Sequence, residues 1–252
     1  MRIRLDHQDE LMNGHKLQGG DEGSRHGLTN CHVFIDFDGT IAPVDTTDLL
    51  LERYADPAWT SVEEDWKAGR IGSRECLVRQ IDLVRALPEA VDALLAEIEI
   101  DPWFEGFVRL CRRHGFATTV VSDGLDRSVE TVLRRAGLDL PYFANHLEWL
   151  GGDRWRLGFP HGREDCKALS GNCKCAFAHA AGPVARILVG DGRSDFCIAH
   201  RVDLVLAKGK LAQYCRDNGL AYQEFTTFAE ASALLDSWFR ARQDGANNRV
   251  SP

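Results

Sequence analysis

The eight residues Val33–Thr40, with the sequence VFIDFDGT, are the segment around which this 252-residue chain is organised. The segment Cys31–Phe37 is short, apolar and partly β-branched, which predicts a buried strand. Asp36 and Asp38 stand two residues apart at its end, where Gly39 permits a sharp turn. Since parallel strands present functional residues at their carboxyl ends, we expect both carboxylates in a site. The alternative interpretation is an ordinary Asp-Gly turn after a strand.

The composition narrows the class of protein. A net charge of −8 argues against a nucleic-acid binder, which usually carries a basic face. The sequence contains no run of 18 apolar residues, so no membrane-spanning helix is predicted. Residues 1–30 lack the apolar core of a signal peptide and are expected to be a disordered extension, and residues 243–252 a polar tail. Eight cysteines in a chain of this length favour reduced thiols and a cytoplasmic protein.

The rest of the chain predicts an α/β protein with a Rossmann-like parallel sheet. Residues 45–100 have only helical patterns, which predicts a small helical cap inserted after the first strand. Its expected helices are Asp48–Tyr54, Ala58–Ala68, Ser73–Ala86 and Pro88–Ile98. In residues 101–242 strands alternate with helices, so the core is expected to comprise residues 31–44 and 101–242. Its further strands are expected at Phe116–Val121, Arg186–Val189 and Asp203–Ala207, with a hairpin at Phe143–Trp149 and Arg154–Phe159.

Two of these strands also end in small or acidic residues. One is followed by Ser122-Asp123-Gly124, and another by Gly190-Asp191-Gly192, with Asp195 close behind. Parallel topology would bring these ends beside Asp36 and Asp38 at one edge of the sheet. A hydroxyl and backbone amides suit an anion, and clustered carboxylates suit Mg²⁺. We therefore expect phosphoryl chemistry at this edge.

These motifs resemble motifs I, II and IV of the haloacid dehalogenase superfamily of phosphatases, over residues 32 to 240. The resemblance implies a phosphomonoester hydrolase that acts on a small phosphorylated metabolite. It implies that Asp36 is the nucleophile that becomes phosphorylated and that Asp38 is the general acid and base. The phosphate group would be bound by Ser122, Asp123 and Gly124. Mg²⁺ would be held by Asp36, the Asp38 carbonyl and Asp191, with support from Asp195.

The resemblance also requires a lysine, motif III, for which Lys167 and Lys174 are candidates. We favour Lys174, because its Asn-Cys-Lys context is similar to a subgroup of the family. That subgroup includes the methionine-salvage phosphatase for 2-hydroxy-3-keto-5-methylthiopentenyl-1-phosphate and the phosphoethanolamine/phosphocholine phosphatases. Phosphoserine is a further candidate substrate, and a non-catalytic phospho-ligand binder is the alternative from another class. The Ser-Asp-Gly turn departs from Ser-Gly-Gly, so we expect the Asp123 carboxylate to point outward.

Three further predictions concern residues outside the main motifs. Asp45 could contact the substrate or cap the helix that follows it. Arg79, in the cap, could reach a substrate oxygen or lie on a solvated helix face. A structural zinc site could form from His161, Cys166, Cys173 and Cys175, with a redox-active pair or plain packing as alternatives.

Overall fold

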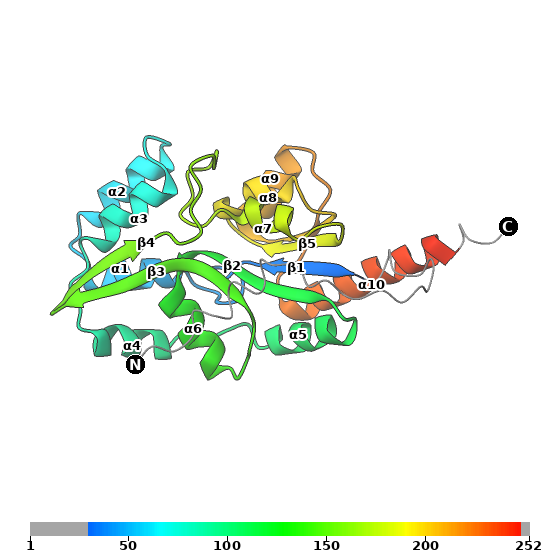
Figure 1. Ribbon diagram of the computed structural model, residues 1–252, viewed down its shortest axis with the longest axis horizontal. Helices are drawn as coiled ribbons and strands as arrows, with labels where there is room; N and C mark the ends of the chain where they lie inside the picture. The colour runs from blue at the N-terminus through cyan, green and yellow to red at the C-terminus, as the bar shows by residue number, and fades with distance from the viewer. Residues whose placement is uncertain (1–29, 248–252) are drawn as a thin grey trace, which may run out of the picture.

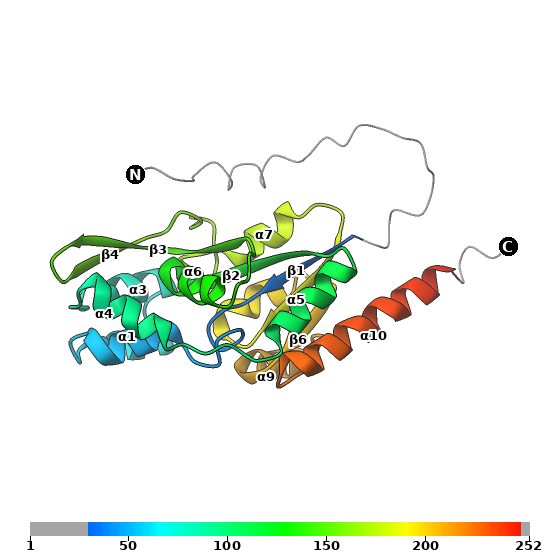
Figure 2. The same cartoon turned by 90° about the horizontal axis from the view of Figure 1, so that it is seen from below.

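The computed structural model describes residues 30–247 of the chain (Figures 1 and 2). The predicted N-terminal extension lies almost entirely outside this range, as do the last five residues of the predicted tail. Within the described range the fold is the expected α/β architecture, with a sheet covered by helices on both faces. Among the described helices, none is both long and apolar enough to cross a membrane.

The sheet has seven strands in the order β4-β3-β2-β1-β5-β6-β7, which places the first strand at its centre. All neighbours are parallel except β3 and β4, which form the predicted hairpin. The strands are β1 (Cys31–Ile35), β2 (Ala117–Leu125), β3 (Tyr142–Gly151), β4 (Arg154–Gly158), β5 (Ala185–Gly190), β6 (Leu204–Ala207) and β7 (Gln223–Glu224). In register, Val33 of β1 lies between Thr118 and Ile187. This register brings the ends of β1, β2 and β5 to the same edge.

Helices cover the two faces of the sheet in separate groups (Figure 1). One face packs against α5 (Phe104–Arg113), α6 (Asp126–Arg135) and α10 (Phe228–Asn247). The other packs against α7 (Lys174–Ala180), α8 (Phe196–Ala199) and α9 (Gly209–Asp217). A short 3₁₀ turn, η1 (Arg193–Asp195), precedes α8. The alternating inward side chains of β1 explain this arrangement, because Val33 and Ile35 enter one apolar cluster and Phe34 enters the other.

The predicted cap is formed by α1 (Thr46–Tyr54), α2 (Trp59–Lys67), α3 (Ser73–Ile81) and α4 (Pro88–Ala96). These helices share one apolar cluster with the sheet, through residues such as Leu50, Ile81 and Val91. In Figure 1, α2 and α3 lie on the same side of the sheet as α7–α9, beside the β3–β4 hairpin. The end of α1 and the turn after α3 are joined by a bridge between Ala55 and Val84.

Several predicted boundaries differ from the structure. Helix α3 ends at Ile81 and not at Ala86, because the Ala86 amide donates a hydrogen bond to Asp153 O at 3.1 Å. Helix α10 continues through residues 243–247, which were expected to be tail. Strand β2 runs to Leu125 and therefore includes the Ser-Asp-Gly turn, with a register shift between Val121 and Leu125. The short strand β7 was not predicted.

Candidate active site

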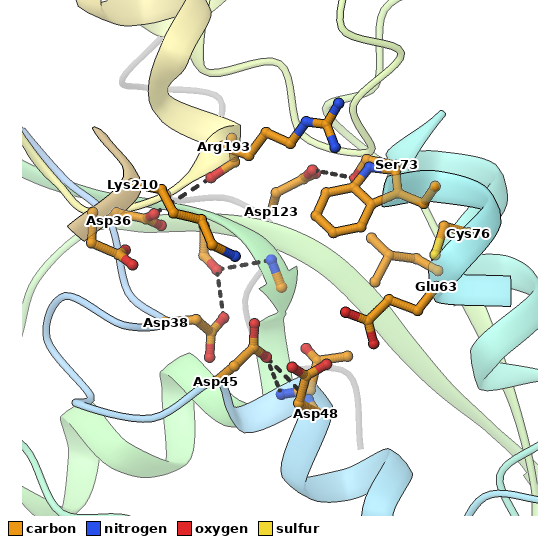
Figure 3. A pocket seen from close by; sticks show the side chains of 18 of the residues that line it. Asp36, Asp38, Asp45, Asp48, Glu63, Ser73, Cys76, Asp123, Arg193 and Lys210 are labelled. Carbon is orange, nitrogen blue, oxygen red and sulfur yellow. Dashed lines mark hydrogen bonds between the residues drawn. The ribbon is translucent and has the colours of Figure 1, made fainter. Parts of the chain in front are cut away.

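The ends of β1, β2 and β5 open into a cavity of about 400 Å³, and α1, α2 and α3 form its other wall (Figure 3). A cavity of this size suits a small molecule. The core contributes a group of side chains that includes Asp36, Asp38, Ser122, Asp123, Asp191 and Arg193. The helical wall contributes a second group that includes Asp45, Asp48, Glu63, Trp66, Ser73 and Gln80. The predicted motif residues therefore meet in one place.

Lys174 is the best-defined charged group at the base of the site. Its ammonium lies 2.7 Å from Asp36 Oδ1 and 2.7 Å from Asp195 Oδ1, and it donates to Ser194 Oγ at 2.9 Å. The side chain is only 2% exposed. Burial acts to lower the pKa of Lys174, but the carboxylates of Asp195 and Asp36 outweigh burial and raise it. Lys174 thus stays charged beside Asp36 and Asp195, whereas Lys167 is exposed.

Asp38 has an environment that favours its protonated form. Its Oδ1 accepts hydrogen bonds from the Thr46 amide at 2.8 Å and the Thr46 hydroxyl at 2.7 Å. Its Oδ2 lies 3.4 Å from Ser122 Oγ. The two Thr46 hydrogen bonds act to lower the pKa of Asp38, but burial, followed by the nearby Asp45 carboxylate, raises this pKa well above its ordinary value. A carboxylic acid that keeps its proton near neutral pH is suited to donate that proton to a leaving group.

The Ser122-Asp123-Gly124 turn lies directly beside Asp38. The Gly124 amide donates to Ser122 Oγ at 2.9 Å, and any side chain on Gly124 would collide with the Asp38 carboxylate. The Asp123 carboxylate is held by hydrogen bonds to other segments of the chain. Asp123 Oδ2 accepts from Ser73 Oγ at 2.6 Å (Figure 3). Asp123 Oδ1 accepts from the Asn172 amide at 2.8 Å. These hydrogen bonds direct the extra carboxylate toward α3 and the segment before α7.

The acidic residues at the sheet edge fit a divalent cation. One ligand atom each from Asp36, Asp191 and Asp195 lies within 4.8 Å of the others. Asp195 has both oxygens engaged, by Lys174 and by the amides of Asp191 and Gly192, so it suits a supporting role. These three carboxyl groups outnumber the single positive charge of Lys174 beside them, so a divalent cation would offset the excess negative charge. The carboxylate oxygens are also the hard ligands that Mg²⁺ prefers.

Burial, followed by the Asp36 charge, raises the pKa of Asp191 to about 6. The Thr40 hydroxyl donates to Asp191 Oδ1 at 2.9 Å and holds the carboxylate in place. Gly39 has a positive φ of 71°, and a Cβ at this position would collide with the Asp191 carboxylate. Gly39 therefore serves both the turn after β1 and the close approach of Asp191.

The predictions for Asp45 and Arg79 have different outcomes. Asp45 is the N-cap of α1, accepting from the Thr47 and Asp48 amides at 3.0 Å, and it also lines the cavity. Arg79 forms an ion pair with Glu75 within α3 and is not among the cavity residues. The geometry therefore places Arg79 on a helix face, as in the alternative interpretation.

The predicted zinc site is not supported. Within residues 30–247, the only cluster of three or more potential ligands is the aspartate group described above. The His161 ring packs against Phe143 and Phe177 instead, and burial lowers its pKa. Cys175 turns away to Cys197, with 2.9 Å between the two sulfur atoms. The contacts of His161 with the two phenylalanines and of Cys175 with Cys197 therefore separate these two side chains from a common metal site.

Several site residues were not predicted. Ser194 contacts Lys174 and lies 3.4 Å from Asp36 Oδ2, while Thr40 and Thr46 hold Asp191 and Asp38. Thr40 and Ser194 stand inside recognised motifs, so their position in the sequence could have indicated them. Arg193 lies over the Trp66 ring, 5.2 Å from its centroid, and thereby joins the core to α2. No sequence signal indicated that contact.

Comparison with known proteins agrees with this geometry. The family model for haloacid dehalogenase-like hydrolases matches residues 33–200. A 2-hydroxy-3-keto-5-methylthiopentenyl-1-phosphate phosphatase from Exiguobacterium sp. is 31% identical over 209 residues, covering 81% of this chain and 96% of the relative. The enzyme of the same name from Brevibacillus brevis is 28% identical and covers 81% of this chain and 94% of the relative.

Solved structures show the same fold. A phospho-aspartyl intermediate analogue of phosphoserine phosphatase superposes with a TM-score of 0.56 at 22% identity, covering 72% of this chain and 89% of that one. A phosphoserine phosphohydrolase-like protein from Francisella tularensis has a TM-score of 0.62 at 16% identity, covering 81% and 98%. The motifs, the fold and the family match together show that this chain belongs to the haloacid dehalogenase-like hydrolases.

Proposed function

We propose that this protein is a Mg²⁺-dependent phosphomonoester hydrolase that acts on a small phosphorylated metabolite through a phospho-Asp36 intermediate. The observation that carries the proposal is the difference between the surroundings of the two aspartates. Asp36 is paired with the Lys174 ammonium at 2.7 Å, whereas burial and the Asp45 carboxylate raise the pKa of Asp38. One carboxylate is thus ready to attack and the other to donate a proton.

The reaction then has two steps. A carboxylate oxygen of Asp36 attacks phosphorus, and the bond from phosphorus to the ester oxygen breaks as Asp38 gives that oxygen its proton. In the second step Asp38 removes a proton from water, whose oxygen attacks phosphorus. The bond to Asp36 breaks, inorganic phosphate leaves and both aspartates return to their starting states. Ser122 and the amides of its turn would hold the phosphate oxygens during both steps.

Mg²⁺ would be held by the carboxylates of Asp36 and Asp191 and by the Asp38 carbonyl, with Asp195 in support. When bound, it supplies positive charge beside the phosphoryl oxygens, where the transition state is negatively charged. Lys174 contributes a second positive charge at the base of the site and orients Asp36. Residues 45–100 would act as the cap that encloses the leaving group and limits access to water.

The first candidate substrate is 2-hydroxy-3-keto-5-methylthiopentenyl-1-phosphate. Support comes from the relatives named for that activity, which align over most of their own length. The helical wall of the cavity is partly apolar, with Trp66 and Leu77 beside polar Gln80 and Ser73. Such a mixture suits a leaving group that carries both hydroxyl and methylthio groups.

A second candidate class is a phosphorylated amine, such as phosphoserine or phosphoethanolamine. Asp45, Asp48 and Glu63 lie together on the side of the cavity away from Asp36 (Figure 3). Burial, followed by the charges of Asp45 and Glu63, raises the pKa of Asp48 to about 7. Such crowding of negative charge would be relieved by a positively charged leaving group.

The test is hydrolysis of p-nitrophenyl phosphate with Mg²⁺ and with EDTA, followed by small esters that differ in the leaving group. Mg²⁺-dependent turnover is the expected result. A preference for neutral hydroxylated esters would support the first substrate, and a preference for amine esters the second. If folded protein that binds Mg²⁺ hydrolysed none of the esters, this result would contradict the enzymatic proposal and favour a phospho-ligand binder.

A further inference from the structure

The carboxylate of Asp123 joins two segments of the chain that are far apart in sequence. Its Oδ2 accepts the Ser73 hydroxyl of α3 at 2.6 Å, and its Oδ1 accepts the Asn172 amide at 2.8 Å. The Asp123 carbonyl also accepts from Asn145 Nδ2 at 2.6 Å. Hydrogen bonds therefore fix both the side chain and the backbone of this residue. Asp123 belongs to the phosphate-facing turn, so these contacts bear on the geometry of that turn.

The start of α3 is held firmly enough to orient Ser73. The N-cap position is Gly72, which has no side chain to accept a hydrogen bond. A Cβ there would collide with Leu169, so α3 begins directly against this segment. The Arg74 amide donates to Leu169 O at 3.0 Å, and Arg74 Nη2 donates to Ser170 O at 3.1 Å. The segment before Asn172 thus supports the same end of α3 that contacts Asp123.

Asn172 extends this network to the catalytic lysine. Its Nδ2 donates to Ser122 O and to Phe143 O, both at 2.8 Å, and the residue is buried. Lys174 follows two residues later at the start of α7. One buried network therefore connects the wall formed by α3, the turn Ser122–Gly124 and the segment that delivers Lys174.

We propose that Asp123 is a positioning residue that couples α3 to the phosphate-facing turn through the Ser73–Asp123 hydrogen bond. The inference rests on the function proposed above. A leaving group that packs against α3 stabilises Ser73, and Ser73 fixes the Asp123 carboxylate. The backbone of Ser122–Gly124 is then held in the orientation in which its groups meet the phosphate. Removal of the hydrogen bond should impair the chemical steps more than the binding of the ester.

A double-mutant cycle tests the coupling. We expect Ser73→Ala and Asp123→Ala each to lower kcat about tenfold, with KM changed less than about twofold, as suits the loss of one charge-assisted hydrogen bond. The double variant should be no slower than the slower single variant, because both changes remove the same contact. Ser73→Thr keeps a hydroxyl and should retain most of the activity. Ser61→Ala, on the exposed side of α2, is the matched control and should behave as wild type.

Losses that multiply to about a hundredfold in the double variant would overturn the coupling, and so would an unchanged kcat in Ser73→Ala. Hydrogen exchange gives a second readout that does not depend on turnover. Ser73→Ala should speed exchange in peptides covering 117–125, and Asp123→Ala should speed exchange in peptides covering 73–81. Reciprocal changes without any ester hydrolysis would keep the coupling and contradict the proposed function. If the wild type hydrolysed esters, but the effects of the two substitutions on kcat multiplied and neither changed hydrogen exchange in the other segment, the proposed function would stand and the coupling would be contradicted.

Discussion

Lys174 places its ammonium 2.7 Å from Asp36, and both side chains are almost completely removed from solvent. Asp195 pairs with the same ammonium at 2.7 Å from the other side. Two carboxylates and one cation are therefore buried together at the base of the site. The stability of the fold and the proposed chemistry depend on the same three residues. Experiments can separate the structural role of each residue from its chemical role.

Replacement of Lys174 should affect both stability and activity. Lys174→Ala leaves two buried carboxylates without their cation, which should cost about 3–5 kcal/mol in the free energy of unfolding. Hydrolysis should fall to background even at temperatures where the variant is folded. Urea unfolding and p-nitrophenyl phosphate assays would measure the two effects. Lys167→Ala is the control, since Lys167 is exposed, and it should match wild type in both. The reverse pattern would assign the catalytic lysine to Lys167.

Replacement of the proposed nucleophile should stop turnover with little change in shape. Asp36→Asn keeps the size of the side chain but removes the charge that attacks phosphorus, so kcat should fall by at least about a thousandfold. Rapid-quench assays with labelled ester should also detect no phosphorylated protein. Circular dichroism before and after Mg²⁺ addition checks that the variant is folded. Substantial hydrolysis by Asp36→Asn would show that another group is the nucleophile.

Mg²⁺ should stabilise the protein more at pH 7.5 than at pH 5. The pKa of Asp191 is raised to about 6, so below this pH a proton competes with the metal for the carboxylate. For the metal-free protein, a raised pKa means a contribution to stability that is present at low pH and declines as pH rises through about 6. At about 100 times Kd, Mg²⁺ should raise Tm by about 5–10 °C at pH 7.5. Calorimetry at both pH values would show it, and an equal shift at both would contradict the assignment of Asp191.

The acidic wall of the cavity, formed by Asp45, Asp48 and Glu63, gives a pH test for the two substrate classes. Since the pKa of Asp48 is raised to about 7, its negative charge appears as pH rises through that value. For an amine ester, KM should therefore fall between pH 6 and pH 8, whereas KM for a neutral ester of similar size should change little. Asp48→Asn should abolish the pH dependence for the amine ester. If both esters respond alike in wild type, the acidic wall does not select the leaving group.

The sequence predicted the edge of the sheet well because residues that are neighbours in the sequence specify both the strand and the turn that follows it. A buried strand followed by Asp36-Phe37-Asp38-Gly39 specifies both the strand and the site, and the same holds for the residues around Ser122 and Asp191. Lys174 could also be chosen over Lys167 from its neighbours in sequence. These segments meet because parallel strands share one edge, which is a general property of the fold.

The predictions that failed depend on contacts between distant segments. The partners of the Asp123 carboxylate are Ser73 and Asn172, and they were not predicted because neither spacing nor composition connects them to it. The early end of α3 depends on Asp153, in the turn between β3 and β4. The zinc prediction counted residues on one loop, but the packing of His161 against Phe143 and Phe177 directs its ring elsewhere.

The position of the cap in the chain has a consequence for how such enzymes diversify. The groups that we propose act on phosphorus come from the ends of β1, β2 and β5 and the start of α7, while much of the opposite wall lies within residues 59–81. Substitutions in that segment can alter the preferred leaving group while the chemistry is inherited unchanged. The hydrogen bond between Ser73 and Asp123 connects this variable segment to the turn that faces the phosphate. In proteins descended from one ancestor, the residues at positions 73 and 123 should therefore change together, while the other positions of α3 change independently of position 123.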